Sequence, residues 1–390
     1  MRLAVVLFRY FPHGGLQRDA LGVATRLRDR GHAVTMLTGD WRGPRPDRIA
    51  VRVLGRRGWT NHGRNRRFAA AARAETAGDR FDGIVGFNRM PGLDVYYCSD
   101  SCYRGDALAR HGPLYRLTPR FRHMAAFEDA VFAPDAGTEI LVLTEREQAR
   151  YAACYATPPE RFHPVPPMIA RDRMRPDEAE AAARRAAVRA ALGIGADEVL
   201  LLQIGASLGT KGLDRSLRAL AGLPADLRGR TRLAAVGGGD PGPARRLARR
   251  LGIGDRVRML GARDDVPDLL LGADLLVHPA RRELAGQAIL EAVVAGLPVL
   301  TSAVCGYSPH VERAGAGIVL PEPFDQAALT AALADMLTLP RRSDWACNGV
   351  RYGREHDLYS GLDRAAALIE GLIAARRAQP VPARPDRARA

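Results

Sequence analysis

Short apolar segments alternate with segments of helical length along almost the whole chain, and this alternation limits the possible folds more than any single motif. The first half has predicted strands at 2–9, 32–38, 83–87, 93–98 and 140–144. The second half has them at 199–204, 232–236, 257–260, 275–278 and 299–301. Strands that alternate with helices form parallel sheets with helices on both faces. The sequence therefore predicts an α/β fold of two doubly wound, Rossmann-like domains.

A proline-rich stretch separates the two series. Prolines cluster between residues 158 and 167 and interrupt both periodicities. We therefore expect one domain at 1–167 and a second at 168–354, facing each other across a cleft at the carboxyl ends of their strands. A helix at 355–376 is expected to pack back on the first domain. The stretch 377–390, rich in Pro, Arg and Ala, is expected to be a disordered basic tail.

Charge and cysteine content narrow the classes of partner. The formal net charge of +15 favours anionic partners, such as nucleotide phosphates, nucleic acid or an acidic membrane surface. The five cysteines are scattered and have neither zinc-site nor disulfide-framework spacing, which indicates a reducing compartment. No apolar run approaches the roughly 20 residues that cross a bilayer. We therefore expect a cytoplasmic protein whose contact with a membrane is peripheral.

Lys211 is the one lysine among 58 basic side chains. It lies in the loop 205–212, between the predicted strand 199–204 and a predicted helix at 213–221, a setting in which backbone N–H groups bind phosphate. A compact ammonium suits a phosphate oxygen in such a loop. The spacing is not that of a Walker A loop, and no Gly-x-Gly-x-x-Gly follows the first strand. We interpret Lys211 as an anion-binding residue; a chance survivor of arginine-rich codon usage is the alternative.

Two glutamates flank the start of a further predicted helix. Glu283 precedes a helix start near Ala285-Gly286, and Glu291 lies inside that helix among apolar neighbours. The helix N-terminus offers donors and partial positive charge, and carboxylates accept hydrogen bonds from paired hydroxyls. The pattern favours a sugar and a ribose as ligands over two solvated surface glutamates.

Three weaker signals lie elsewhere. Paired Gly14 and Gly15, between the first strand and first helix, would let a backbone approach a diphosphate, although an ordinary turn explains them equally well. Asp100 ends a strand, where capping residues are also common. Arg173, just past the proline-rich stretch, could reach a phosphate.

The segment 102–123 interleaves arginines with apolar and aromatic residues. That pattern suits an anionic membrane surface, with rings at the headgroup level and guanidinium groups on phosphate. A solvated basic helical hairpin fits the pattern equally well.

Taken together, these motifs resemble glycosyltransferase family 4, and most of all its lipopolysaccharide core glucosyltransferase I type. The resemblance covers nearly the whole chain. In the first half it rests on the stretches 9–19, 60–65, 85–96 and 114–118, and in the second on the Glu-x7-Glu pair with the stretches 211–216, 295–301 and 303–307. It implies the GT-B fold and a retaining hexosyltransferase that uses UDP-glucose without a metal or other cofactor. The implied acceptor is a heptose of the membrane-embedded lipopolysaccharide inner core, at the inner face of the inner membrane.

The resemblance also implies a role for each matching residue. Gly15 beside Gly14, Arg173 and Lys211 would hold the UDP diphosphate, Glu291 the ribose and Arg263 the uridine. Glu283, Ala285 and Gly286 would position the glucose, and Asp19 and Asp100 would face the acceptor. The chain departs from the family at Thr210, where the family has an arginine directly before the lysine.

The implied mechanism is reaction on one face of the sugar, with the leaving phosphate assisting the acceptor, because no carboxylate is evident for a double displacement. Three other classes of protein are weighed against it. The single lysine also suits a pyridoxal-phosphate enzyme, although its glycine-flanked loop speaks against one. The charge suits nucleic acid, although no binding motif is recognisable. A UDP-sugar epimerase or hydrolase would share the architecture, as would a family 4 transferase that uses another nucleotide sugar or acceptor.

Overall fold

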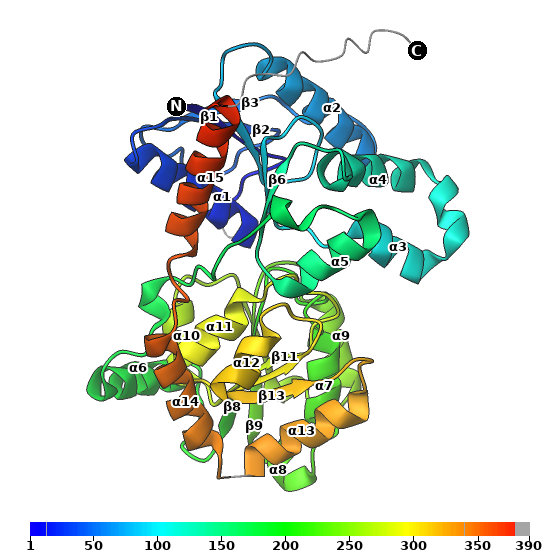
Figure 1. Ribbon diagram of the computed structural model, residues 1–390. Coiled ribbons are helices and arrows are strands. Elements are labelled where there is room, and N and C mark those ends of the chain that lie inside the picture. Colours follow the sequence, from blue (N-terminus) through cyan, green and yellow to red (C-terminus); the bar gives the residue numbers. More distant parts are fainter. Residues whose placement is uncertain (13, 339, 379–390) are drawn as a thin grey trace. The chain divides into compact units, whose positions relative to one another are not determined.

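The structure, a computed structural model, describes residues 1–12, 14–338 and 340–378 (Figure 1). The chain divides into two compact units. The first comprises Met1–Val165 and the described residues from Leu362 onward, and the second comprises Pro166–Gly361. Each unit is a parallel α/β unit. The predicted fold class of two doubly wound domains is therefore confirmed.

The first unit has a seven-stranded parallel sheet in the order β3-β2-β1-β4-β5-β6-β7. Its strands are β1 (Arg2–Leu7), β2 (Ala33–Thr38), β3 (Ala50–Val53), β4 (Gly83–Gly86), β5 (Val95–Cys98), β6 (Glu139–Val142) and β7 (Phe162–Pro164). Its α-helices are α1 (Gly15–Asp29), α2 (Asn61–Glu75), α3 (Tyr103–His111), α4 (Pro119–Phe132), α5 (Glu145–Tyr155) and α15 (Gly361–Ala378).

The second unit has a six-stranded parallel sheet in the order β10-β9-β8-β11-β12-β13. Its strands are β8 (Val199–Ile204), β9 (Thr231–Val236), β10 (Val257–Gly261), β11 (Leu275–His278), β12 (Val299–Ser302) and β13 (Gly317–Leu320). Its α-helices are α6 (Glu178–Ala191), α7 (Leu213–Ala221), α8 (Ala225–Arg230), α9 (Gly242–Arg250), α10 (Val266–Gly272), α11 (Gln287–Val294), α12 (Ser308–Ala314), α13 (Gln326–Thr338) and α14 (Arg342–Glu355).

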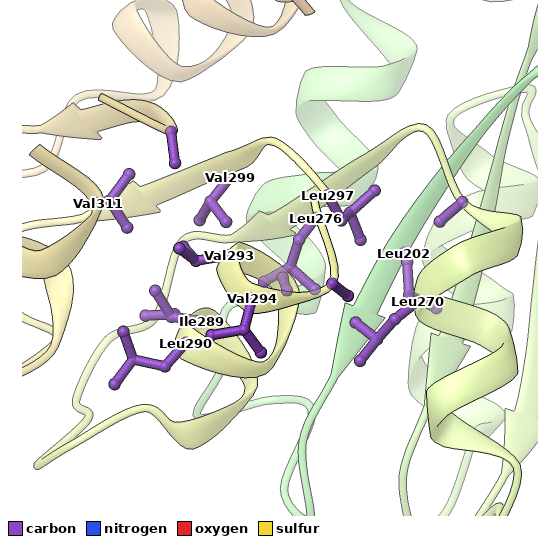
Figure 2. Packing of buried hydrophobic residues seen from close by; sticks show 14 of the residues in the cluster. Leu202, Leu270, Leu276, Ile289, Leu290, Val293, Val294, Leu297, Val299 and Val311 are labelled. Atoms are coloured by element: carbon purple, nitrogen blue, oxygen red, sulfur yellow. The ribbon is translucent and has the colours of Figure 1, made fainter. Parts of the chain in front are cut away.

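Two apolar clusters, one on each face of the second sheet, form the core of this unit. Figure 2 shows the cluster in which Leu276 from β11 packs against Ile289 and Val293 from α11. The other cluster joins the opposite face to Leu217 of α7 and Leu333 of α13. Burial on both faces explains why these strands read as continuous apolar runs rather than alternating ones. It also fixes the N-termini of α7 and α11 relative to the strands that precede them.

The C-terminal part of the chain differs from the expected helix at 355–376. α14 ends at Glu355, and α15 begins only at Gly361. The carboxylate of Asp357 accepts hydrogen bonds from the backbone N–H groups of Tyr359 and Ser360, and this local turn competes with helix formation.

α15 lies beside α1 (Figure 1) and is joined to it by ion pairs from Arg26 to Asp363 and from Arg30 to Glu370. The helix continues to Ala378, so the first two residues of the expected tail are helical. The rest of that tail, 379–390, lies outside the described residues.

Candidate active site

Two loops of the second unit meet at the carboxyl ends of adjacent strands. One loop follows β8 and leads through Lys211 into α7, and the other follows β11 and leads through Glu283 into α11. β8 and β11 pair directly, so the topology brings these loops together although about 70 residues separate them.

Hydrogen bonds hold the second loop against the first loop and against α7. The N–H of Arg281 donates to the carbonyl oxygen of Thr210 at 2.9 Å. The guanidinium of Arg215 donates to the carbonyl oxygens of Pro279 and Ala280 at 3.1 and 3.0 Å. Gly212 has φ +76°, and a Cβ there would lie 2.1 Å from the carbonyl oxygen of Pro279. Glycine is therefore required at 212 both by backbone conformation and by the close approach of the second loop.

Lys211 belongs to the first loop, and its ammonium is directed at the second one. Its carbonyl oxygen accepts a 2.7 Å hydrogen bond from Gln203, which anchors the backbone. A Cβ at Gly205 would lie 2.5 Å from Cγ of Lys211, so the side chain packs against the start of its own loop. The ammonium forms an ion pair with the carboxylate of Glu283, and both side chains are largely buried.

Glu283 has a second donor within reach. Oε2, the same oxygen that faces Lys211, lies 3.2 Å from Nε2 of His278. Burial opposes ionisation of Glu283, but the hydrogen bond from His278 and the charge of Lys211 outweigh it and hold the pKa of this carboxyl below its ordinary value. An ionised, hydrogen-bond-accepting oxygen pair is therefore kept beside a lysine ammonium.

The helix that follows Glu283 begins at a glycine. Gly286 has φ +97° and, as the N-cap residue of α11, brings no side chain to the helix N-terminus. Ala285 is held from the other side, since its carbonyl oxygen accepts a 2.8 Å hydrogen bond from the N–H of Tyr307. Helix N-termini carry partial positive charge, so this segment can accept anionic or hydroxyl oxygens close to its backbone.

Glu291 and Arg173 form a second pair in the same unit. Glu291 lies inside α11 and is 7% exposed, so the expectation that it avoids an open face is correct. Oε1 of Glu291 lies 3.5 Å from Nε of Arg173, which also pairs with Asp172 at 3.0 Å. The side chain of Arg173 is 10% exposed. It is therefore not a freely solvated surface arginine, which the sequence alone would also allow.

Arg263 and Thr210 are the remaining predicted residues of this unit. Arg263 lies between β10 and α10, is exposed, and pairs with Asp265 two residues further on. Thr210 is partly buried, and its hydroxyl lies 3.1 Å from that of Ser207 in the same loop. At the position where the family has a guanidinium, this chain thus has two neighbouring hydroxyls.

The first unit contains the other predicted residues. Gly14 is the N-cap of α1 and Gly15 its first residue. A Cβ at Gly14 would lie 1.9 Å from Oε1 of Gln17, whose amide in turn donates to the carbonyl oxygen of Arg9. The glycine therefore leaves room for a side chain that fastens the turn between β1 and α1.

Asp19 and Asp100 are each held by a tyrosine of β5. The Tyr97 hydroxyl donates to Asp19 at 3.1 Å, and the Tyr96 hydroxyl donates to Asp100 at 3.2 Å. Consecutive strand residues point to opposite faces of a sheet, so the two aspartates are held from opposite sides of the strand. Burial, reinforced by the charge of Asp100, raises the pKa of Tyr96 well above its ordinary value, which keeps its hydroxyl a donor.

A buried ion pair in the first unit was not predicted. Arg89 and Glu128 are almost fully enclosed and lie 2.6 Å apart. Glu128 also accepts hydrogen bonds from the N–H groups of Tyr103 and Arg104, the first two residues of α3, at 2.5 and 2.9 Å. This carboxylate therefore caps α3 from α4 and fixes the start of the basic segment 102–123.

The surface of the basic segment matches its sequence pattern. Leu114 and Leu117 are 79% and 65% exposed. The arginines at 110, 116, 120 and 122 are exposed as well. Leu114 and Leu117 are therefore exposed to solvent in the same segment as these arginines.

The structure thus brings together Lys211 with Glu283, and Arg173 with Glu291. It adds His278, which was not among the predicted site residues. The sequence feature that could have identified it is a histidine at the end of an apolar strand, directly before a proline. Within the described ranges, no group of three or more His, Cys, Asp or Glu side chains is arranged to hold a metal ion. No helix in the same ranges is long and apolar enough to cross a membrane.

Comparison with known proteins places this site in a family. The family model "Glycosyl transferases group 1" matches residues 184–351. The lipopolysaccharide glucosyltransferase WaaG of Escherichia coli K12 is 43% identical over 95% of this chain and 99% of its own length.

The crystal structure of WaaG, a glycosyltransferase involved in lipopolysaccharide biosynthesis, has a TM-score of 0.89 and covers 95% of this chain and 100% of its own. HepE of Anabaena, in complex with UDP-glucose, is 16% identical with a TM-score of 0.71 over 96% of this chain and 100% of its own, a likeness that concerns the fold alone. The identity and coverage of the match to WaaG show that this chain belongs to the WaaG family of glycosyltransferases, enzymes of lipopolysaccharide biosynthesis with the GT-B fold.

Proposed function

We propose that this enzyme transfers glucose, with retention of configuration, from UDP-glucose to a heptose of the lipopolysaccharide inner core. The observation that carries the proposal is the ion pair of Lys211 and Glu283 between the N-termini of α7 and α11. A cation for a diphosphate and an ionised acceptor for sugar hydroxyls lie next to each other there, as a nucleotide sugar requires.

Each residue of the site has a role in this proposal. Lys211 and Arg173 hold the diphosphate, and Glu291 binds the ribose. Glu283, with the backbone of Ala285 and Gly286, orients the glucose. Arg263 lies beside the uridine. Asp19 and Asp100 face the acceptor.

Bond breaking builds negative charge on the departing UDP. Lys211, Arg173 and the N-terminus of α11 stabilise that charge electrostatically, which is usually the largest catalytic contribution in such sites. The leaving phosphate takes up the acceptor proton on the same face of the sugar, and the proposal requires neither a metal nor another cofactor.

The basic segment 102–123 supplies the membrane contact in this proposal. Leu114 and Leu117 enter the headgroup region, and the exposed arginines pair with lipid phosphates at the inner face of the inner membrane. Sedimentation with vesicles of anionic and of zwitterionic lipid tests this: binding to the anionic vesicles should fall sharply in the double variant Leu114→Ser, Leu117→Ser. Equal binding by the variant would refute it.

A panel of donors tests the main proposal. A ligand that binds only the folded state raises the melting temperature by mass action. We expect stabilisation by UDP-glucose, and transfer of labelled glucose to heptose-terminated core lipopolysaccharide. UDP-galactose, UDP-N-acetylglucosamine, GDP-mannose, pyridoxal phosphate and a short DNA duplex are the comparison ligands. A response to a different nucleotide sugar alone would replace the donor, and a response to none of the sugars would refute the proposal.

A further inference from the structure

His278 lies next to Glu283 in the predicted donor site and is almost fully enclosed. It ends β11 and is 1% exposed. Its backbone carbonyl accepts a 3.0 Å hydrogen bond from the hydroxyl of Thr301 on the neighbouring strand, so the residue cannot shift along β11 without losing that bond. The sheet therefore fixes the position of the His278 ring.

The hydrogen bonds of the ring define its tautomer. Nε2 faces Oε2 of Glu283 at 3.2 Å. A carboxylate oxygen only accepts hydrogen bonds, so Nε2 carries the proton. Nδ1 is buried and has no hydrogen-bond partner among the described residues. A lone pair at Nδ1 costs less there than a second N–H without an acceptor. The ring therefore donates to Glu283 from Nε2.

Glu283 shares a single oxygen between two donors. Lys211 and His278 both contact Oε2. When a diphosphate enters, its charge competes with Glu283 for the ammonium of Lys211. Glu283 then loses its stronger partner while still largely buried, and an enclosed carboxylate without donors is costly.

We propose that His278 is a positioning residue: it holds the carboxylate of Glu283 in place when Lys211 turns to the donor diphosphate, so that Oε1 stays directed at the sugar hydroxyls. The exchange needs no movement of the backbone, because the two loops are already fastened together by Arg281 and Arg215. This inference rests on the donor roles of Lys211 and Glu283 proposed above.

Two substitutions of similar size separate the hydrogen bond from simple packing. In His278→Gln the amide nitrogen reaches the position of Nε2 and can still donate to Glu283. In His278→Asn the amide is too short to do so, while polarity is retained. We expect His278→Asn to lower kcat by about tenfold or more, the scale of a lost hydrogen bond to a charged group. We expect His278→Gln to keep kcat within about threefold of the wild type, because its donor remains.

The binding of UDP alone shows whether the effect is local. UDP lacks the sugar but carries the diphosphate that draws Lys211 away from Glu283. In calorimetry His278→Asn should therefore bind UDP more weakly than the wild type, because Glu283 is left without a donor, whereas His278→Gln should bind it as tightly as the wild type. Equal kcat in His278→Asn and wild type would overturn the inference. If both variants lost their UDP affinity and also failed to fold, the inference would be overturned as well. Such a result would mean that His278 supports the loop as a whole.

A second measurement is independent of any donor. In the unliganded wild type, ¹⁵N NMR of the His278 ring should show the proton on Nε2; a proton on Nδ1 would overturn the inference. Wild-type protein that carries the Nε2 proton but neither binds nor transfers from UDP-glucose would instead refute the proposed function. The two failures are therefore distinguishable.

Discussion

The N-termini of α3 and α11 each lie beside an ion pair, and the two pairs differ in how far they are enclosed. In the first unit, Glu128 caps α3 and pairs with Arg89, and both side chains are sealed from water. In the second, α11 begins at Gly286 without a capping side chain, and the nearby pair of Lys211 and Glu283 keeps some exposure. The buried carboxylate of Glu128 permanently accepts hydrogen bonds from the first N–H groups of α3. A helix that begins at a glycine, such as α11, leaves room at its N-terminus for an exchangeable ligand. We therefore expect the pair of Arg89 and Glu128 to act structurally and the pair of Lys211 and Glu283 to act in ligand binding.

The largest expected effect comes from breaking the sealed pair. Arg89→Met leaves Glu128 buried without its cation, which should lower the free energy of unfolding by about 3–5 kcal/mol. Urea unfolding measures the loss. Arg89→Met combined with Glu128→Leu should recover part of it, because the unpaired charge is removed as well. A loss below about 1 kcal/mol, the range of an exposed pair, would contradict the assignment.

Breaking the exchangeable pair should affect activity instead. Lys211→Ala is expected to lower turnover by about 10²-fold or more, the scale for losing one preorganised charge donor. The melting temperature without donor should change little by comparison with Arg89→Met. Initial-rate kinetics and thermal melts on the same preparation provide both readings. Turnover that survives nearly intact would remove Lys211 from the active site.

The pH dependence of turnover tests the ionisation of Glu283. Because Lys211 and His278 hold the pKa of this carboxyl below its ordinary value, the active, ionised form should persist as the pH falls past that ordinary value and disappear only at the lowered one. The acidic limb of kcat/KM, which reports the free enzyme, should therefore move to higher pH in Lys211→Ala. Circular dichroism over the same range checks that the fold survives. The limb should be absent in Glu283→Gln; an unchanged limb in that variant would assign it to another group.

The smallest effect is expected at Thr210. Thr210→Arg restores the guanidinium that the family has before the lysine, next to the hydroxyl of Ser207. A partly exposed charge contact contributes up to about 1 kcal/mol, so KM for UDP-glucose should fall by about two- to fivefold with kcat unchanged. Thr210→Ser is the matched control. A rise in KM for the arginine variant would mean that the two hydroxyls cannot be replaced by a cation.

The sequence predicted best where burial is complete on both faces. β8, α7 and β11 begin and end at the expected residues, since apolar runs there are bounded by loop residues. β3 was missed because it is short and largely exposed, and β7 because it has three residues and ends in a proline. These strands exist because the sheet provides partners, which no local pattern records.

In the candidate site, too, some residues could be predicted from local sequence and others could not. The glycines and glutamates around α11 were recognisable because spacing along one helix is local information. The pair of Arg89 and Glu128 joins residues 39 positions apart through tertiary packing alone, and Glu128 resembles any other helical glutamate in the sequence. His278 is recognisable in the sequence as a histidine at a strand end. Its partner Glu283 lies in the following loop, and the sequence does not show how that loop folds back onto the strand.

The near-contact of Gly212 with the carbonyl oxygen of Pro279 limits how this enzyme can be redesigned. Transplanting either the 205–212 loop or the 279–286 loop from a homologue would place foreign backbone against a surface shaped for the native one. We therefore expect that the two loops can be exchanged only together. Chimeras that exchange both together should fold where single-loop chimeras do not, so a search for new donor preferences should vary the loops as a pair.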